Sequence, residues 1–318
     1  MSAVATASVV EAKLHALATA NLVEALLESV LYGVYGVLCI TVLYLFRSRE
    51  RRPAVWVSTG LVIQFFTITG HWIGTLYATL FAFGHLNGGT AAAAFYDNLS
   101  SAWYLTNLSF LGATFLVTNL LVIHRVHVIF SNNRTVTGLP FIILMVEMVS
   151  LVGLVYQFAK SHPGEQSIVI YGLSNPWVTT SLVTSMVLVF APTISAYSTG
   201  MISWKILRIT RALNRLLDRI DGGVPLMSIL AIIVESAALH MAITISTLVT
   251  YHVGFVGQVV FSGISPVVIG ISTILIHARS GLGWAHGSGS DGAASNPTRI
   301  GFATSPEGSL ELDDRRRK

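Results

Sequence analysis

The sequence predicts an all-α protein, a seven-transmembrane helix bundle with the amino end outside and the carboxyl end in the cytosol. Three observations lead to this prediction. The 318-residue chain is 53% hydrophobic and 11% charged, whereas a soluble domain is about a quarter charged. Seven apolar stretches are long enough to cross a bilayer, and basic residues alternate between the segments that join them.

The apolar stretches fit the ~20 helical residues that are needed to cross ~30 Å of hydrocarbon. Several of them carry a proline in the first turn, where a helix needs no backbone N–H. We expect spans at residues 23–46, 54–83, 101–129, 136–158, 176–202, 225–251 and 256–276. These divide the chain into a short extracellular amino terminus (1–22), the bundle (23–283) and a Gly/Ser-rich, disordered cytosolic tail (284–318).

The basic residues predict the orientation, because short cytosolic loops carry an excess of Lys and Arg. Seventeen of the 19 Lys and Arg residues fall in the first, third and fifth loops and the tail. Only Lys13 and Lys160 fall on the other side. The net charge of +4 is then a consequence of membrane topology, and we expect a lipid bilayer and no nucleic acid as partner.

The fifth span is expected to continue into the cytosol as a basic amphipathic helix over residues 203–221. Its basic residues recur every three or four positions and so share one helical face: Lys205, Arg208, Arg211, Arg215 and Arg219. Two interpretations stay open for this basic stripe. One is attraction to anionic lipid, and the other is a docking surface for a cytosolic signalling partner such as a G protein.

Two acidic residues lie deep inside predicted spans. Glu147 and Glu235 are roughly 16 and 15 Å from the cytosolic ends of their helices, near mid-membrane. An unpaired carboxylate there costs at least ~2.5 kcal/mol, so we expect both to face the bundle interior. Each is either an intramembrane switch or ion site, or a structural hydrogen bond between helices.

A second polar group is predicted nearer the outer side and comes from four spans: Glu28, His71, Asn107 and His240. One hypothesis is that these residues line a ligand pocket open to the exterior. The alternative is that each histidine only bonds to a neighbouring backbone. The group has no metal-ligand spacing, and the chain has no nucleophile motif or phosphate-binding glycine loop, so we expect no metal, no cofactor and no enzyme activity.

Small residues and prolines are expected to shape the helices. Pro192 and Pro266 interrupt the fifth and seventh spans and are candidate hinges. Gly70 and Gly74 form a small-xxx-small step that favours close helix packing. Cys39 is the single cysteine, so an intrachain disulfide is impossible.

Three segments carry a resemblance: "ISWKILRITR" after the fifth span, "IIVESAAL" in the sixth and "HARSGLGWA" at the end of the seventh. They resemble uncharacterised seven-span membrane proteins of mushroom-forming fungi. The resemblance implies the fold, and Glu235 as a family position, but no ligand or activity. The topology also looks like that of G-protein-coupled receptors, although His124-Arg125-Val126 stands where many of them have an acidic-Arg-aromatic triplet.

Two functions are compatible with these observations. The first is a receptor-like signal transducer of the plasma membrane that senses a ligand from the outer side. The alternative is a small-molecule or lipid transporter that uses Glu147 and Glu235 as its polar path. The long basic extension favours the first, and the paired mid-membrane acids favour the second.

Overall fold

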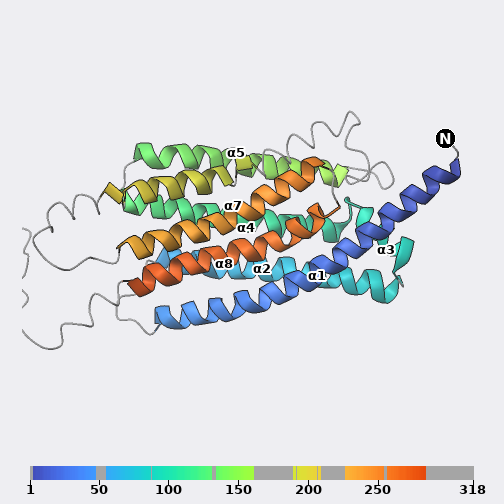
Figure 1. The fold of residues 1–318 in the computed structure, drawn as a ribbon, viewed down its shortest axis with the longest axis horizontal. Helices are drawn as coiled ribbons and strands as arrows, with labels where there is room; N and C mark the ends of the chain where they lie inside the picture. Colours follow the sequence, from blue (N-terminus) through green and yellow to red (C-terminus); the bar gives the residue numbers. More distant parts are fainter. Residues whose placement is uncertain are drawn as a thin grey trace, which may run out of the picture.

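The computed structural model describes residues 3–47, 55–86, 88–130, 134–160, 189–190, 192–205, 207–208, 226–253 and 256–283. Within these ranges every regular element is a helix (Figure 1). The elements are α1 (Ala3–Arg47), α2 (Val55–Leu80), the π-helix η1 (Phe81–His85), α3 (Gly89–Asp97), α4 (Ala102–Ile129), α5 (Arg134–Lys160), α7 (Leu226–Val253) and α8 (Gln258–Gly283). Residues 192–205 are also helical.

The long helices lie side by side as a bundle along the longest axis of the molecule (Figure 1). α8 contacts α1, α2, α4 and α7, which makes it the central helix among those described. An apolar cluster joins α1, α2, α4 and α8, and it includes Tyr35, Ile68, Leu121 and Val267. Two groups of buried polar residues accompany this cluster and are described below.

Four helical stretches are long and apolar enough to cross a membrane: His15–Arg47, Ala102–Ile129, Thr135–Lys160 and Gln258–Ala278. A shorter apolar stretch covers Ala237–Val253. The outward side chains are as apolar as the core, for example Val30 (69% exposed) and Ile40 (69%) on α1. Buried polar groups inside an apolar surface are the reverse of a soluble protein, so the apolar helices indicate an integral membrane protein in contact with lipid.

The observed helices agree with most of the predicted spans. α2 with η1, α4, α5, α7 and α8 coincide within a few residues at most ends with the stretches expected at residues 54–83, 101–129, 136–158, 225–251 and 256–276, although α2 is not among the four stretches named above. The first part of the predicted fifth span (176–188), the end of the basic extension and the tail lie outside the described residues.

The amino-terminal region differs from the prediction. α1 begins at Ala3, so most of the segment predicted as a separate amino terminus continues the helix of the first span. At 45 residues α1 is roughly 68 Å long, more than twice the ~30 Å of hydrocarbon. Its amino end projects from the bundle (Figure 1), and Leu17 packs there against Ala78 and Ala82 and against Ala92 and Tyr96 of the unpredicted helix α3.

The small-xxx-small step predicted in the second span is a packing feature, as expected. A Cβ added at Gly70 would lie 2.6 Å from the Phe110 ring, and one at Gly74 would lie 2.6 Å from Asn107 Oδ1. Both neighbours belong to α4. The two glycines therefore let α2 and α4 approach closely enough for their polar side chains to meet.

Candidate functional site

The site begins with two carboxylates on the buried face of α1. Glu24 and Glu28 are four residues apart, so they lie one above the other on the same side of the helix. Their exposed fractions are 7% and 0%. Two acidic side chains are thus turned into the bundle within one helical turn.

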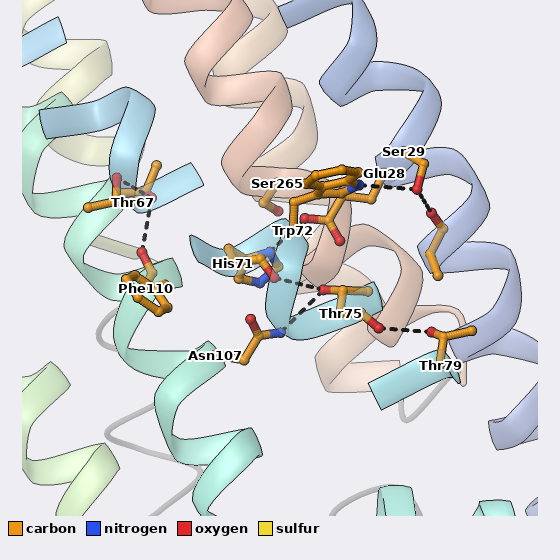
Figure 2. Close-up of polar contacts among 12 residues, drawn as sticks. Glu28, Ser29, Thr67, His71, Trp72, Thr75, Thr79, Asn107, Phe110 and Ser265 are labelled. Carbon is orange, nitrogen blue, oxygen red and sulfur yellow. Dashed lines mark hydrogen bonds and ion pairs between the residues drawn. The ribbon is translucent and has the colours of Figure 1, made fainter. Parts of the chain in front are cut away.

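Glu28 is paired with a histidine of α2. Its Oε1 lies 2.7 Å from His71 Nδ1, and the His71 side chain is as buried as its partner (Figure 2). Thr75 Oγ1 donates to the His71 backbone oxygen at 3.2 Å, and Asn107 Nδ2 donates to Thr75 Oγ1 at 3.3 Å. The pair is therefore linked through Thr75 to α4, where Asn107 lies.

Next to the Glu28–His71 pair, aromatic packing joins α1 to α2. The Trp72 ring stacks on Tyr32 of α1, with 4.3 Å between centroids and 10° between planes. Trp72 Nε1 donates to Ser29 Oγ at 3.2 Å, and the Tyr32 hydroxyl lies 2.9 Å from Thr69 Oγ1. These contacts lock α1 and α2 together and fix the rotamers around Glu28 and His71.

A cavity of about 210 Å³ lies beside the pair. Side chains of α1, α2, α4, α5, α7 and α8 line it, so it is enclosed by most of the described bundle. Its polar lining includes Glu24, His71 and Asn107, and its aromatic lining includes Trp103, Phe115 and Tyr251. The residues at the basic ends of the helices are absent from the lining, so the cavity belongs to the opposite half of the bundle.

Glu24 reaches the cavity next to a glycine of α8. A Cβ added at Gly263 would overlap the Glu24 carboxylate, so only glycine leaves space for this group. The sequence analysis did not single out Glu24, because Glu24 is only the second residue of the predicted first span (23–46). The available signal was its spacing of four residues from Glu28, which puts both acids on one face.

Several polar atoms around the cavity lack a hydrogen-bond partner among the described residues. They are Trp103 Nε1, Asn107 Oδ1 and the second oxygen of Glu28, Oε2. Buried polar atoms without partners are rare in folded proteins and call for an explanation such as a bound ligand or water. The cavity thus offers both donors and acceptors.

A second polar group lies within the apolar cluster, nearer than the cavity to the basic ends of the helices. Gln64 Nε2 donates to Thr118 Oγ1 at 2.9 Å and to Thr273 Oγ1 at 3.4 Å, which joins α2, α4 and α8. Asn119 Nδ2 donates to Glu147 Oε2 at 2.8 Å, which joins α4 to α5. The prediction that Glu147 faces the interior is confirmed, since it is 1% exposed.

The prediction that Glu235 also faces the interior is wrong. Its side chain is exposed on α7. The buried residues of this helix, Ala237, His240, Thr244 and Thr247, follow one face at steps of three and four. A residue two positions before Ala237 points to nearly the opposite side of a helix, since each position turns it by about 100°.

The predicted outer pocket is brought together in part. Glu28, His71 and Asn107 meet as described, and His71 and Asn107 line the cavity. His240 is buried on α7 at 3% exposure, but it is not among the lining residues, and its Nε2 has no partner among the described residues. Of the four predicted pocket residues, His71 and Asn107 thus line the cavity, whereas Glu28 and His240 do not, and Glu24 is added.

The basic stripe is described as far as Arg208. Lys205 Nζ donates to the backbone oxygen of Ile129 and lies 4.7 Å from the centroid of the Phe130 ring. Arg208 lies over the Trp204 ring at 5.5 Å. Arg211, Arg215 and Arg219 lie outside the described residues.

The two predicted hinge prolines are both helical in the structure. Pro192 begins the described helical segment 192–205, and Pro266 is buried inside α8, which continues on both sides of it. Pro266 has no N–H for the carbonyl of Ser262, four residues earlier, and Ser262 lines the cavity. Whether the helices bend at these prolines in function stays a prediction.

Among the described residues there is no group of three or more His, Cys, Asp or Glu side chains that could hold a metal ion. Cys39 is buried and free. Comparison of the chain with protein-family models, with curated proteins and with solved structures gave no match. The geometry of the cavity is therefore the basis for a function.

Proposed function

We propose that the protein is a receptor-like integral membrane protein that binds a small ligand from the outer side. The observation that carries this proposal is the cavity of about 210 Å³, in which Glu24, His71 and Asn107 converge within an apolar bundle. A concave site with an apolar wall and a few convergent polar groups is the usual form of a small-molecule site. The basic residues assign this half of the bundle to the outside.

The proposal includes the topology that the sequence predicts, with seven spans and the carboxyl end in the cytosol. α8 supplies a route for the signal, because Ser262 and Gly263 line the cavity and Thr273 bonds to Gln64 in the second polar group. Pro266 lies between these two contacts. A ligand that displaces the outer part of α8 would thus act on the inner hydrogen bonds through the hinge proline.

The signal would leave through the basic stripe, where a G-protein-type partner would dock. Lys205 ties the described part of this helix to the end of α4 through Ile129. A movement of α4 or α8 would therefore be passed to the stripe. Reversing Arg208, Arg211 and Arg215 to Glu should abolish recruitment of a cytosolic partner while leaving the protein folded and inserted.

A conformational reporter tests the receptor role. In a Cys39→Ser background, Arg208→Cys would carry a single environment-sensitive fluorophore, because the chain has no other cysteine. We expect compounds that stabilise the purified protein against heat to shift the fluorophore emission. Both effects should disappear in Thr247→Trp, which fills the cavity. A compound that stabilises through the cavity but leaves the emission unchanged would contradict a receptor.

The second candidate is a transporter, with the second polar group as the observation that favours it. Gln64, Asn119 and Glu147 extend the buried polar surface from the cavity toward the basic ends of the helices, as a permeation path would. In this case a radiolabelled cavity ligand should accumulate in proteoliposomes, and Glu147→Gln should stop it. Binding without accumulation would favour the receptor.

A further inference from the structure

The cavity is lined by an acidic side chain and by no Lys or Arg. Glu24 lines it and Glu28 lies behind His71, whereas no Lys or Arg is among the lining residues. His71 Nδ1 lies 2.7 Å from Glu28 Oε1, so the imidazole pairs with Glu28 and not with Glu24. Glu24 is left with no hydrogen bond or ion pair among the described residues, although it is only 7% exposed. A buried carboxylate without a partner is costly, and either a proton or a cation has to neutralise it.

The backbone around Glu24 is built to keep this carboxylate in place. Gly263 leaves the space that any other residue would fill. Its neighbour Ser262 also lines the cavity and has a carbonyl that receives no helical N–H from Pro266. Asn107 Oδ1 adds a further acceptor without a partner. Residues of three helices that carry such acceptors therefore line one cavity, which favours a ligand with several N–H donors.

Aromatic rings form much of the remaining wall. Trp103, Tyr104 and Phe115 come from α4, Phe158 from α5 and Tyr251 from α7. The Tyr104 and Phe158 rings meet edge to face, at 87° and 5.8 Å. The faces of such rings attract organic cations, and they also pack against an apolar ligand body.

The size of the cavity limits the ligand. A cavity of about 150 Å³ in another protein holds benzene, and sites for drug-sized ligands occupy about 300–1,000 Å³. At about 210 Å³ this cavity lies between the two. It is suited to a compact molecule of roughly ten non-hydrogen atoms.

From these four features we infer that the cavity binds compact organic cations, in which an ammonium group on an aromatic or aliphatic body pairs with Glu24. The inference rests on the proposed function, because it names the class of ligand for the same cavity. His71 and Glu28 pair with each other and join α1 to α2, while Glu24 supplies the counter-charge to the ligand. Trp103 Nε1 remains as a donor for a polar group on the body of the ligand.

Two probes of similar shape test this inference on the full chain in lipid nanodiscs. Phenethylammonium carries the charge, and 2-phenylethanol replaces it with a hydroxyl. Binding is measured by thermal stabilisation as a function of probe concentration. We expect phenethylammonium to bind at least about tenfold more tightly, as a charge-assisted hydrogen bond predicts. The preference should disappear in Glu24→Gln and persist in Glu235→Gln, a matched change on the exposed face of α7.

Each other outcome overturns the inference in a distinct way. Equal binding of both probes would mean that a proton neutralises Glu24, while the cavity would remain a ligand site as proposed. Binding of neither probe would reject the ligand class. A cation preference that survives Glu24→Gln would remove Glu24 as the counter-ion. If Glu24→Gln does not fold, Glu24→Asp decides the last point, since it keeps the charge but withdraws it by one methylene and should weaken phenethylammonium selectively.

Discussion

Glu24 and Glu28 are the same residue type on the same helical face, yet their surroundings differ. Glu28 is fully buried and held by His71, whereas Glu24 faces a cavity and has no partner among the described residues. The difference arises from α2 and α8. α2 brings an imidazole to Glu28, and α8 brings the bare backbone of Gly263 to Glu24. We therefore assign Glu28 to stability and Glu24 to binding.

The Glu28–His71 pair should be strongly coupled. We expect Glu28→Ala and His71→Ala each to lower the free energy of unfolding by about 3–5 kcal/mol, because each leaves a buried polar partner alone. The double variant should cost less than the sum of the two. Reversible unfolding in detergent measures all three. Additive effects would show that the two side chains act independently.

The Asn119–Glu147 hydrogen bond should be weaker and should not require a charge. Glu147→Gln keeps the shape and should change the free energy of unfolding little, whereas Glu147→Leu should cost about 0.6–2 kcal/mol, the usual range between membrane helices. The same unfolding measurement applies, with Glu235→Gln as the control. A large loss in Glu147→Gln would instead indicate that the ionised carboxylate is required.

Sequence reasoning identified the polar residues but not all of their directions. Glu28, His71, Asn107 and Glu147 were expected inside, and they are. Glu235 was also expected to face the bundle interior, because an unpaired carboxylate in lipid is costly. Its side chain is exposed and does not share the buried face of α7. The cost of a charge depends on depth and surroundings, which a single sequence does not contain. The helical phase of Ala237 and Thr244 would have been the better guide.

At the scale of helices, the close approach of α2 and α4 depends on two glycines. A methyl group at Gly70 would lie 2.6 Å from the Phe110 ring, while one at Gly33 of α1 would meet nothing within 4 Å. We expect Gly70→Ala to lower the free energy of unfolding by about 1–3 kcal/mol, as overpacking does. Gly33→Ala, the matched control, should be neutral or slightly stabilising.

A second substitution tests whether the expected loss in Gly70→Ala arises from contact with Phe110. Phe110→Leu removes the ring that the new methyl group would meet, so it should recover part of the loss in the Gly70→Ala variant. Thermal unfolding of the single and double variants in nanodiscs measures the recovery. If Gly70→Ala and Gly33→Ala lower the stability equally, the packing of α2 against α4 at Gly70 is not tight.

The long helices were easier to predict than the short helix α3 and the amino-terminal extension of α1. Long apolar runs bounded by prolines and basic residues predicted α2, α4, α5, α7 and α8 within a few residues. α3 was missed because its nine residues are too few to span a bilayer, and its alanine-rich sequence has no marked periodicity. The extension of α1 to Ala3 was missed because the prediction took its boundary from hydrophobicity, whereas Leu17 is held by packing against η1 and α3.

At the scale of the whole molecule, the distribution of charge predicts the topology. Seventeen of the 19 Lys and Arg residues are expected on the cytosolic side. We expect a tag at the amino end to react with antibody on intact cells and a tag at the carboxyl end to react only after permeabilisation. Both tags on one side would contradict seven spans and, with them, the receptor proposal.

Ligand binding in the cavity would depend on single residues, on helix packing and on the orientation of the protein in the membrane. Glu24 provides a charge, the glycines of α2 and α8 provide space, and the topology decides which solution reaches it. A cavity that opens to the outer side alone is what a receptor needs. A cavity that also opens to the cytosol is what a transporter needs.

The most direct test of this account is the reaction of a cavity cysteine with a membrane-impermeant thiol reagent. In a Cys39→Ser background, Thr247→Cys places the only thiol in the cavity lining, and Thr273→Cys places a control thiol in the second polar group. We predict that Thr247→Cys reacts in intact cells, that phenethylammonium slows the reaction, and that Thr273→Cys does not react. Reaction of Thr247→Cys only after permeabilisation would contradict it.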